Sequence, residues 1–478
     1  VTGVQTCALP ISRHRGLLTI NRKRPAYWAA FFVERPAMSV SAVKAPEIIV
    51  HHARGGSVLL MDPMPHTTGA AIGLWFPFGS AHESEGERGL SHFVEHMVFK
   101  GAGERNAEEL SRVIDRVGGY LNAFTERETV CLHSLVPGGS ASLAASVLLD
   151  MACSPRLKGD DFEREKDVLA NEIMAADDDL EEAGQDEFFA LTYAHGGLGR
   201  KIAGTVADVR NARFETLVDF HARRFASGPV VMAAAGNIDP VRLAALFDQA
   251  LIGRPARTTP VADDPVFVPT RAMMRASGSQ VYVYTGLALP VDLDENYFWR
   301  LSIASSAYGE SMSSRLFMRL REQEGLCYSI SSAFSLSPLA GLWGVASSTA
   351  PAQLKRFAEA YNRESTAFFQ EGLTKVEIEE AKSRLRGLLS LAGDDPEYRM
   401  KRLARQFMFS GQVETVDRTL ARLEVHGEIG DESVNAMVRS LLNPAAENIL
   451  LYGRINKQTE RAGAELFGTA MIEGGVHG

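Results

Sequence analysis

The chain has 478 residues, of which 45% are hydrophobic and 23% charged, and its formal net charge is −9 at pH 7. No apolar run approaches the roughly 18 residues that a membrane-spanning helix needs, so we expect a globular chain without a membrane partner. The acidic balance also argues against nucleic acid as a partner, because phosphate backbones bind basic surfaces.

The first 37 residues are set apart from the expected fold. Residues 1–11, VTGVQTCALPI, resemble a sequencing adapter translated in frame, and residues 12–37 are basic, lack a period and precede the first methionine, Met38. We interpret 1–37 as a disordered upstream artefact; the alternative is a weak signal peptide, because RKR is followed by the apolar AYWAAFFV. These residues carry six Lys or Arg and one acid, so without them the formal charge falls from −9 to −14.

Three cysteines remain beyond that segment, Cys131, Cys153 and Cys327. An odd number without C-x-x-C spacing argues against a disulfide framework and against a zinc site built from thiolates. We therefore expect a cytoplasmic protein, with the periplasm as the alternative compartment.

Turn residues and hydrophobic periodicity divide the first half of the chain into short elements. Short strands are expected within 47–83 and a helix within 89–101. The elements expected next are a helix at 106–119 that stops at a Gly pair, a strand at 120–137, helices at 140–153 and 159–190, and a buried strand within 228–239.

A stretch rich in Pro, Ala and Thr, residues 253–280, has no period and is typical of an interdomain linker. It predicts a first domain at 38–254, a linker at 255–278 and a second domain at 279–478.

The two halves share a weak internal repeat. YVYTGLALP (282–290) stands where AAIGLWFPFG (70–79) stands in the first half, and GLTKVEIEEAKSRLRGLL (372–389) resembles LKGDDFEREKDVLANEI (157–173). We predict an α+β fold of two similar α/β sandwich domains, each a mixed or antiparallel sheet with packed helices, related by internal duplication. The alternative is a coincidence between two unrelated α+β layers.

The segment GLSHFVEHMVFKG (89–101) places two histidines and a glutamate within an apolar run. On a helix His92 and His96 lie on one face, four residues apart, with Glu95 on the same flank. Neutral imidazoles are zinc ligands, and a catalytic zinc lowers the pKa of a bound water, whose proton Glu95 is placed to take. The alternative is a core helix whose histidines are satisfied by hydrogen bonds.

A later helix, DFEREKDVLANEIMAADDDLEE (161–182), offers carboxylates for a third ligand. Most of its acids are expected on a solvated face. Glu165 and Glu172 differ, because two residues seven apart on a helix point in nearly the same direction. Glu172 follows His96 by 76 residues.

The H-x-x-E-H helix, the distal glutamate and GGYLNAFTERET (118–129) between them resemble the inverzincins of the insulinase and pitrilysin family, and in particular the short-chain branch of proteins like the mitochondrial processing peptidase. The resemblance implies a zinc metalloendopeptidase that hydrolyses peptides or unfolded polypeptides, with one zinc per chain. It implies that His92, His96 and Glu172 bind the zinc, that Glu95 is the general base, and that Glu165 supports the ligands. The alternative is a non-catalytic homologue that binds peptides or serves as an assembly subunit.

The same resemblance implies a substrate-binding strand that contains Asn122, Ala123 and Phe124. Adding a peptide to a sheet edge through backbone hydrogen bonds binds it largely independently of its sequence. The alternative is an ordinary paired strand.

A second catalytic pair is implied within SSRLFMRLREQEGLCYSISS (313–332). Taken alone, Arg321 is typical of a surface helix and Tyr328 of the start of a strand. The family's R-(x)6-Y pattern implies that both reach the active site from the opposite half of the molecule, where they stabilise an oxyanion and hold the peptide.

The family surrounds its active site with four α/β units, and this chain is long enough for two. We therefore expect a homodimer in which the partner subunit's second domain completes each active site; completion within one chain is the alternative. One departure from the family is CLHS (131–134), which leaves His133 as either a pocket or a core residue. The acidic run NEIMAADDDLEE (171–182) suggests an attraction for basic peptides.

Overall fold

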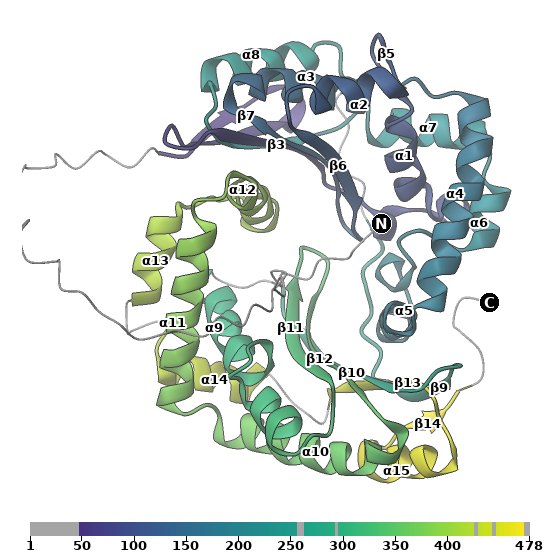
Figure 1. Ribbon diagram of the computed structural model, residues 1–478, viewed down its shortest axis with the longest axis vertical. Helices are drawn as coiled ribbons and strands as arrows, with labels where there is room; N and C mark the ends of the chain where they lie inside the picture. Colours follow the sequence, from purple (N-terminus) through teal and green to yellow (C-terminus); the bar gives the residue numbers. More distant parts are fainter. Residues whose placement is uncertain (1–46, 256–261, 292–294, 425–428, 442–445, 473–478) are drawn as a thin grey trace, which may run out of the picture. The chain divides into compact units, whose positions relative to one another are not determined.

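The computed structural model describes residues 47–255, 262–291, 295–424, 429–441 and 446–472, so the expectations for 1–37 lie outside the described residues. Two six-stranded sheets with packed helices dominate it (Figure 1). The predicted α+β class is confirmed. In the part of the chain that the structure describes, no helix combines the length and the apolarity that crossing a membrane requires.

The first sheet has the strand order β1-β2-β8-β3-β7-β6. Its strands are β1 Ile49–His52, β2 Val58–Pro63, β3 Gly69–Phe76, β6 Tyr120–Thr125, β7 Val130–Pro137 and β8 Val231–Gly236, and a small separate ribbon joins β4 Gly101–Ala102 to β5 Arg105–Asn106. β2 and β8 run parallel, and the other neighbours in this sheet are antiparallel. β8 is buried along its whole length, as its continuous apolar sequence VMAAAG predicts for a strand covered on both faces.

The helices of the first half cover one face of this sheet around a single hydrophobic core. They are α1 Leu90–Val98, α2 Ala107–Asp115, α3 Ala141–Cys153, α4 Gly159–Asp178, α5 Leu180–Thr192, α6 Val206–Asn211, α7 Phe214–Arg224 and α8 Pro240–Ala250. α5 is the exception, because it packs on a sheet of the second half, which is described below.

Two predicted elements of this half are each divided in the structure. The strand expected at 120–137 is a hairpin, because the chain turns at 126–129, where Glu126 N–H donates to the Thr129 carbonyl at 2.8 Å. The helix expected at 159–190 breaks at Asp179, whose side chain accepts the N–H groups of Glu181 and Glu182 and so caps a new helix.

The second sheet has the order β11-β12-β10-β13-β9-β14. Its strands are β9 Arg271–Arg275, β10 Val281–Leu289, β11 Ser329–Leu336, β12 Gly341–Thr349, β13 Asn448–Gly453 and β14 Ala470–Met471. Its helices are α9 Glu295–Ser305, α10 Leu354–Glu371, α11 Lys375–Ala392, α12 Pro396–Ser410, α13 Val416–Glu424, α14 Asp431–Leu441 and α15 Lys457–Phe467.

Five strands of each sheet follow the same path. β2, β8, β3, β7 and β6 correspond to β9, β13, β10, β12 and β11 in order and in pairing direction, and only the remaining edge strands differ. The two similar domains that the repeat predicts are therefore confirmed, with β3 matched to β10.

The linker predicted at 255–278 extends too far. β9 lies inside that range and pairs with β13, so the second sheet begins at Arg271. The short apolar core of RAMMR, enclosed by two arginines and preceded by Pro-rich sequence, gave too weak a strand pattern to be separated from the linker.

Each sheet has its other face covered by a helix from the opposite half. α5 packs on β10 and β13, where Phe188 joins Tyr284 and Leu450 in one apolar cluster. α12 packs on β2, β3 and β8, where Met400 and Leu403 lie in a cluster with strand residues of the first sheet. Figure 1 shows α12 against the face of the sheet that contains β3. The described residues from 47 onward consequently form one compact unit.

Candidate metal centre

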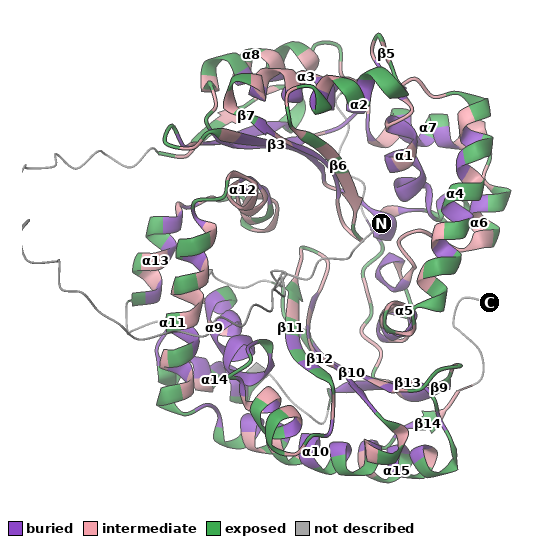
Figure 2. Cartoon of the chain, in the orientation of Figure 1, coloured by how far each residue is buried: buried purple, intermediate pink, exposed green. Residues whose placement is uncertain are grey.

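The helix that carries both histidines is α1, which is buried along most of its length (Figure 2). Leu90, Phe93, Val94 and Met97 anchor it in the core of the first half. Phe93 stacks on Phe162 of α4 with ring centroids 4.6 Å apart. This stacking places α1 beside α4, the helix that carries Glu165 and Glu172.

The structure brings His92, His96 and Glu172 together. One potential ligand atom from each lies within 4.8 Å of the other two. Nε2 of His92 lies 3.9 Å from Oε1 of Glu172, and Nε2 of His96 lies 3.4 Å from Oε2 of the same carboxylate. Ligand atoms around a tetrahedral zinc are about 3.3 Å apart, so a small contraction of this cluster suits the ion.

The chemistry of the three donors also suits zinc. Burial, together with the charge of His96, lowers the pKa of His92 to about 4, against the opposing effect of Glu172. His92 is therefore neutral near pH 7 and keeps a lone pair for a cation. Two imidazole nitrogens and one carboxylate oxygen are a common set for a catalytic zinc with an open fourth position.

Glu165 contacts the ring nitrogen of His96 that does not face Glu172. One of its oxygens lies 2.9 Å from Nδ1 of His96, and the other lies 2.5 Å from Nζ of Lys100. Burial opposes ionisation of Glu165, but these hydrogen bonds hold its pKa below the usual value. An ionised Glu165 accepts a hydrogen bond from Nδ1–H of His96. The other ring nitrogen, Nε2, is then the one directed at Glu172. Sequence reasoning missed Lys100, although its position four residues after His96 is a usable signal.

Glu95 lies beside the cluster in a buried position. Its Oε2 accepts a hydrogen bond from the hydroxyl of Thr125 at 2.5 Å, and burial raises its pKa to about 7. A carboxylate with such a pKa can both accept and return a proton near neutral pH. Thr125 was not found from the sequence, because its contact with Glu95 depends on how β6 lies against α1.

The expected substrate-binding residues Asn122, Ala123 and Phe124 lie in β6, the edge strand of the first sheet. Successive side chains of β6 alternate between two environments. Leu121 and Ala123 pack against the core that contains α1, whereas Phe124 packs against the cluster that contains α12. The edge position is compatible with strand addition.

Arg321 and Tyr328 lie near each other but are not brought to the histidines. The Arg321 guanidinium is 5.5 Å from the centre of the Tyr328 ring, and Tyr328 is 79% exposed. Gly325, with φ of +62°, ends the helical segment between them, as the sequence suggests. Among the described residues, the ion pairs, hydrogen bonds and ring contacts of this pair include none with His92 or His96.

His133 is a buried residue of the interface between the first sheet and α12. Its Nδ1 lies 3.5 Å from Glu397 of α12, and its ring contacts those of Tyr120 and Phe124. Burial and the nearby charge of Lys401 lower its pKa to about 4. Of the two interpretations, this environment favours the core residue.

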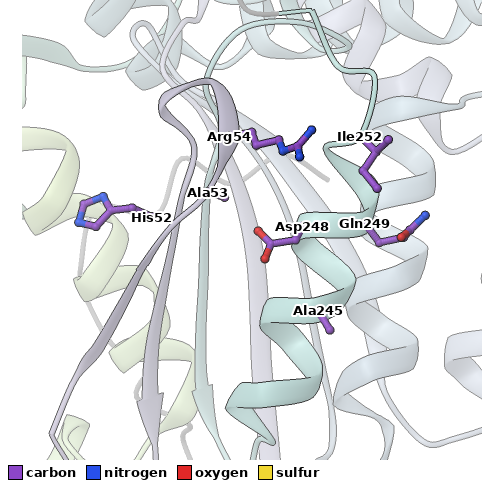
Figure 3. Close-up of a pocket in the computed structure, with 7 residues that line it drawn as sticks. All are labelled: His52, Ala53, Arg54, Ala245, Asp248, Gln249 and Ile252. Atoms are coloured by element: carbon purple, nitrogen blue, oxygen red, sulfur yellow. The ribbon is translucent and has the colours of Figure 1, made fainter.

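A separate open pocket lies between the β1–β2 turn and the end of α8 (Figure 3). Its lining consists of His52, Ala53, Arg54, Ala245, Asp248, Gln249 and Ile252. Because β1 and β6 are opposite edges of the sheet, this pocket is distinct from the centre beside β6.

Two family models match the chain: insulinase (peptidase family M16) over residues 58–206, and peptidase M16 inactive domain over residues 211–385. A Mycobacterium tuberculosis protein named as an uncharacterized zinc protease is 34% identical over 406 residues, which covers 81% of this chain and 89% of that protein. The chain belongs to the insulinase family of peptidases, family M16. The family expected from the motifs is therefore confirmed.

A further relative and two solved structures are also similar to this chain. A Bacillus subtilis protein, also named as an uncharacterized zinc protease, is 27% identical over 388 residues, or 81% of this chain and 94% of that protein. The solved peptidase M16 inactive domain from Pseudomonas fluorescens superposes with a TM-score of 0.76 at 17% identity, covering 86% of this chain and 99% of that one. A chain of complex III from Candida albicans has a TM-score of 0.73 at 15% identity, with coverage of 89% and 100%. These structures support the fold alone.

Proposed function

We propose that this M16 protein is a zinc-dependent metalloendopeptidase that hydrolyses peptides or unfolded polypeptides. The observation that carries the proposal is the convergence of His92, His96 and Glu172 beside the buried carboxylate of Glu95. The names of its relatives as zinc proteases support the choice of metal.

The three converging side chains would hold one zinc ion per chain. When bound, zinc polarises a carbonyl and lowers the pKa of water at the site. Glu95 takes a proton from the water that attacks the peptide carbon, and returns it to the nitrogen that leaves as the C–N bond breaks. Thr125 holds the Glu95 carboxylate in place through their hydrogen bond.

The substrate would bind as an extended strand along the free edge of β6, at Asn122, Ala123 and Phe124. Backbone pairing of this kind suits unfolded polypeptides of varied sequence. Because β6 ends at Thr125, a bound strand would lie beside the residue that contacts Glu95.

Arg321 and Tyr328 would act in a homodimer, each pair completing the metal centre of the partner subunit. The exposure of Tyr328 supports this arrangement, as does the lack of any contact between the pair and the histidines in the described part of one chain. There the phenol and the guanidinium would stabilise the oxyanion and hold the peptide.

The central test incubates the protein with a library of quenched peptides, with and without a chelator. Cleavage should stop with the chelator and return with zinc. Glu95→Gln should retain one equivalent of zinc by elemental analysis while losing a factor of about 100 or more in kcat. Glu163→Gln is the matched control, because Glu163 is an exposed glutamate of α4. Zinc and peptide binding without hydrolysis in the unmodified protein would instead favour a peptide-binding or assembly subunit.

The shared site is tested by mixing inactive Glu95→Gln with inactive Tyr328→Phe. After subunit exchange, half of the dimers contain both variants, and each of these has one intact centre, so about a quarter of the original activity should return. Absence of recovery despite demonstrated exchange would mean that both elements act within one chain.

A further inference from the structure

The N-terminus of α1 has no capping side chain of its own. The helix begins after Gly89, whose φ is +78°, and its first turn contains no acidic residue. A Cβ atom at Gly89 would lie 2.5 Å from the carbonyl oxygen of Ala203, so a side chain at this position has no room. The N–H groups of the first turn, which have no partner within a helix, must therefore find an acceptor elsewhere.

Glu83 supplies that acceptor from a preceding loop. Its Oε2 accepts the N–H of Gly89 at 2.8 Å, and its Oε1 accepts the N–H of Ser91 at 2.7 Å. The side chain is buried, and a negative charge at this end of a helix is stabilised by the helix dipole. Burial raises the pKa of Glu83 to about 7, against the effect of the hydrogen bonds from Ser91 and Gly89.

The loop that carries Glu83 is itself held in place. Arg200 donates a hydrogen bond to the Glu83 carbonyl oxygen, and Ala81 N–H donates to the Arg127 carbonyl at 2.8 Å. The backbone of Gly197 lies so close that a Cβ there would be 1.9 Å from the Ala81 carbonyl oxygen. These contacts fix the backbone of the loop, so the two carboxylate oxygens of Glu83 are held in position to accept the N–H groups of α1.

The two histidines of α1 depend on this support to different degrees. Nδ1 of His96 is held by Glu165, whereas the buried Nδ1 of His92 has no hydrogen-bond partner among the described residues. His92 follows Ser91 directly in the chain. Its direction consequently depends on where the first turn of α1 lies.

We propose that Glu83 is a positioning residue of the metal centre, because it fixes the first turn of α1 and thereby directs His92 at the metal. This inference rests on the metal centre proposed above. It adds a residue that touches neither the metal ligands nor the substrate.

The test measures zinc affinity by competition with a chromophoric chelator and records the visible spectrum of the cobalt-substituted protein. Glu83→Gln replaces one acceptor oxygen with an NH2 group that faces an N–H donor, so one of the two hydrogen bonds is lost. We expect zinc to bind about tenfold or more weakly, with a changed cobalt spectrum that reports altered ligand geometry.

Glu87→Gln is the matched control. Glu87 is a buried glutamate in the same part of the chain, and its hydrogen-bond and ion-pair partners among the described residues are Ser84, Arg223 and Arg224, which lie outside α1. This variant should retain the zinc affinity and the cobalt spectrum of the unmodified protein. Equal losses in both variants would indicate a general effect on stability and would overturn the inference.

A second variant covers the case in which Glu83→Gln fails to fold. Glu83→Asp keeps the charge but is one methylene shorter, so it should fold and bind zinc with intermediate affinity. Unchanged affinity and spectrum in a folded Glu83 variant would overturn the inference while leaving the proposed function intact. If the unmodified protein binds no zinc, the proposed function itself fails.

Discussion

At the scale of single residues, the hydroxyl of Thr125 decides where the carboxylate of Glu95 points. Thr125→Val removes the 2.5 Å hydrogen bond but keeps the shape and β propensity of the side chain. We expect roughly a tenfold loss in kcat, because a less well-oriented base transfers protons less efficiently. Zinc content should stay at one equivalent.

The measurement is steady-state cleavage of one quenched peptide, accompanied by elemental analysis. Thr129→Val is the control, because the Thr129 hydroxyl contacts Glu126 on the same hairpin and not Glu95. Equal kcat values for the two variants would remove Thr125 from the mechanism.

His221 links the stability of the fold to pH. It is buried, its Nε2 lies 3.0 Å from the Ala152 carbonyl oxygen, and burial lowers its pKa to about 4. Between pH 6.5 and 4 the unfolded chain therefore binds a proton at this residue that the folded chain does not. The free energy of unfolding should fall by up to about 3 kcal/mol as the pH drops through this window.

Urea unfolding at pH 7 and pH 5, with a chelator present, measures this dependence. In His221→Gln the free energy of unfolding should fall less between pH 7 and pH 5 than in the unmodified protein. In the control His195→Gln, which changes an exposed histidine, it should fall as much as in the unmodified protein. An identical fall in all three proteins would mean that other groups cause it.

The sequence predicted the part of the site that depends on spacing along helices. His92 and His96 are one turn apart, and Glu165 and Glu172 are two turns apart, so their shared directions follow from helix geometry. Thr125 and Glu83 were missed for a physical reason. Their contacts with α1 depend on how a strand and a loop approach the helix, and no local periodicity encodes that approach.

At the scale of elements, α12 and the first sheet are joined by a buried ion pair. Nε of Arg399 lies 2.7 Å from Oδ2 of Asp62, and both side chains are largely removed from water. Asp62→Asn would leave the Arg399 charge buried without a counter-charge. We expect a loss of about 3 kcal/mol in the free energy of unfolding.

Urea denaturation compares this variant with Glu465→Gln, which removes one partner of an exposed ion pair on α15. The control should unfold at the same urea concentration as the unmodified protein. A stable Asp62→Asn variant would mean that the apolar contacts of α12 alone hold it to the sheet.

The strands and helices themselves were largely predictable from the sequence, but the sheets on which α12 and α5 pack were not. An amphipathic pattern shows that one face of a helix is buried and says nothing about which sheet buries it. The turn at 126–129 and the break at Asp179 were missed because both lie inside polar runs without Gly or Pro.

At the scale of the whole molecule, each half depends on the other, because α5 of the first half packs on the second sheet and α12 of the second half packs on the first sheet. A fragment that ends before the second sheet would expose the strand residues that Met400 and Leu403 cover. We expect residues 47–254 produced alone to aggregate, and the same fragment co-produced with residues 262–478 to yield a soluble complex. Size-exclusion chromatography distinguishes these outcomes; a soluble, monomeric first half would contradict the prediction.

The position of α12 in the chain also sets an order of events during synthesis. β8, the last strand of the first sheet, ends at Gly236, whereas α12 ends at Ser410. At a usual translation rate, a ribosome needs on the order of ten seconds or more to bridge that interval. Throughout that time the apolar face of the first sheet that α12 later covers is exposed to solvent. We therefore expect the nascent chain to bind a chaperone that prevents aggregation until α12 has been synthesised.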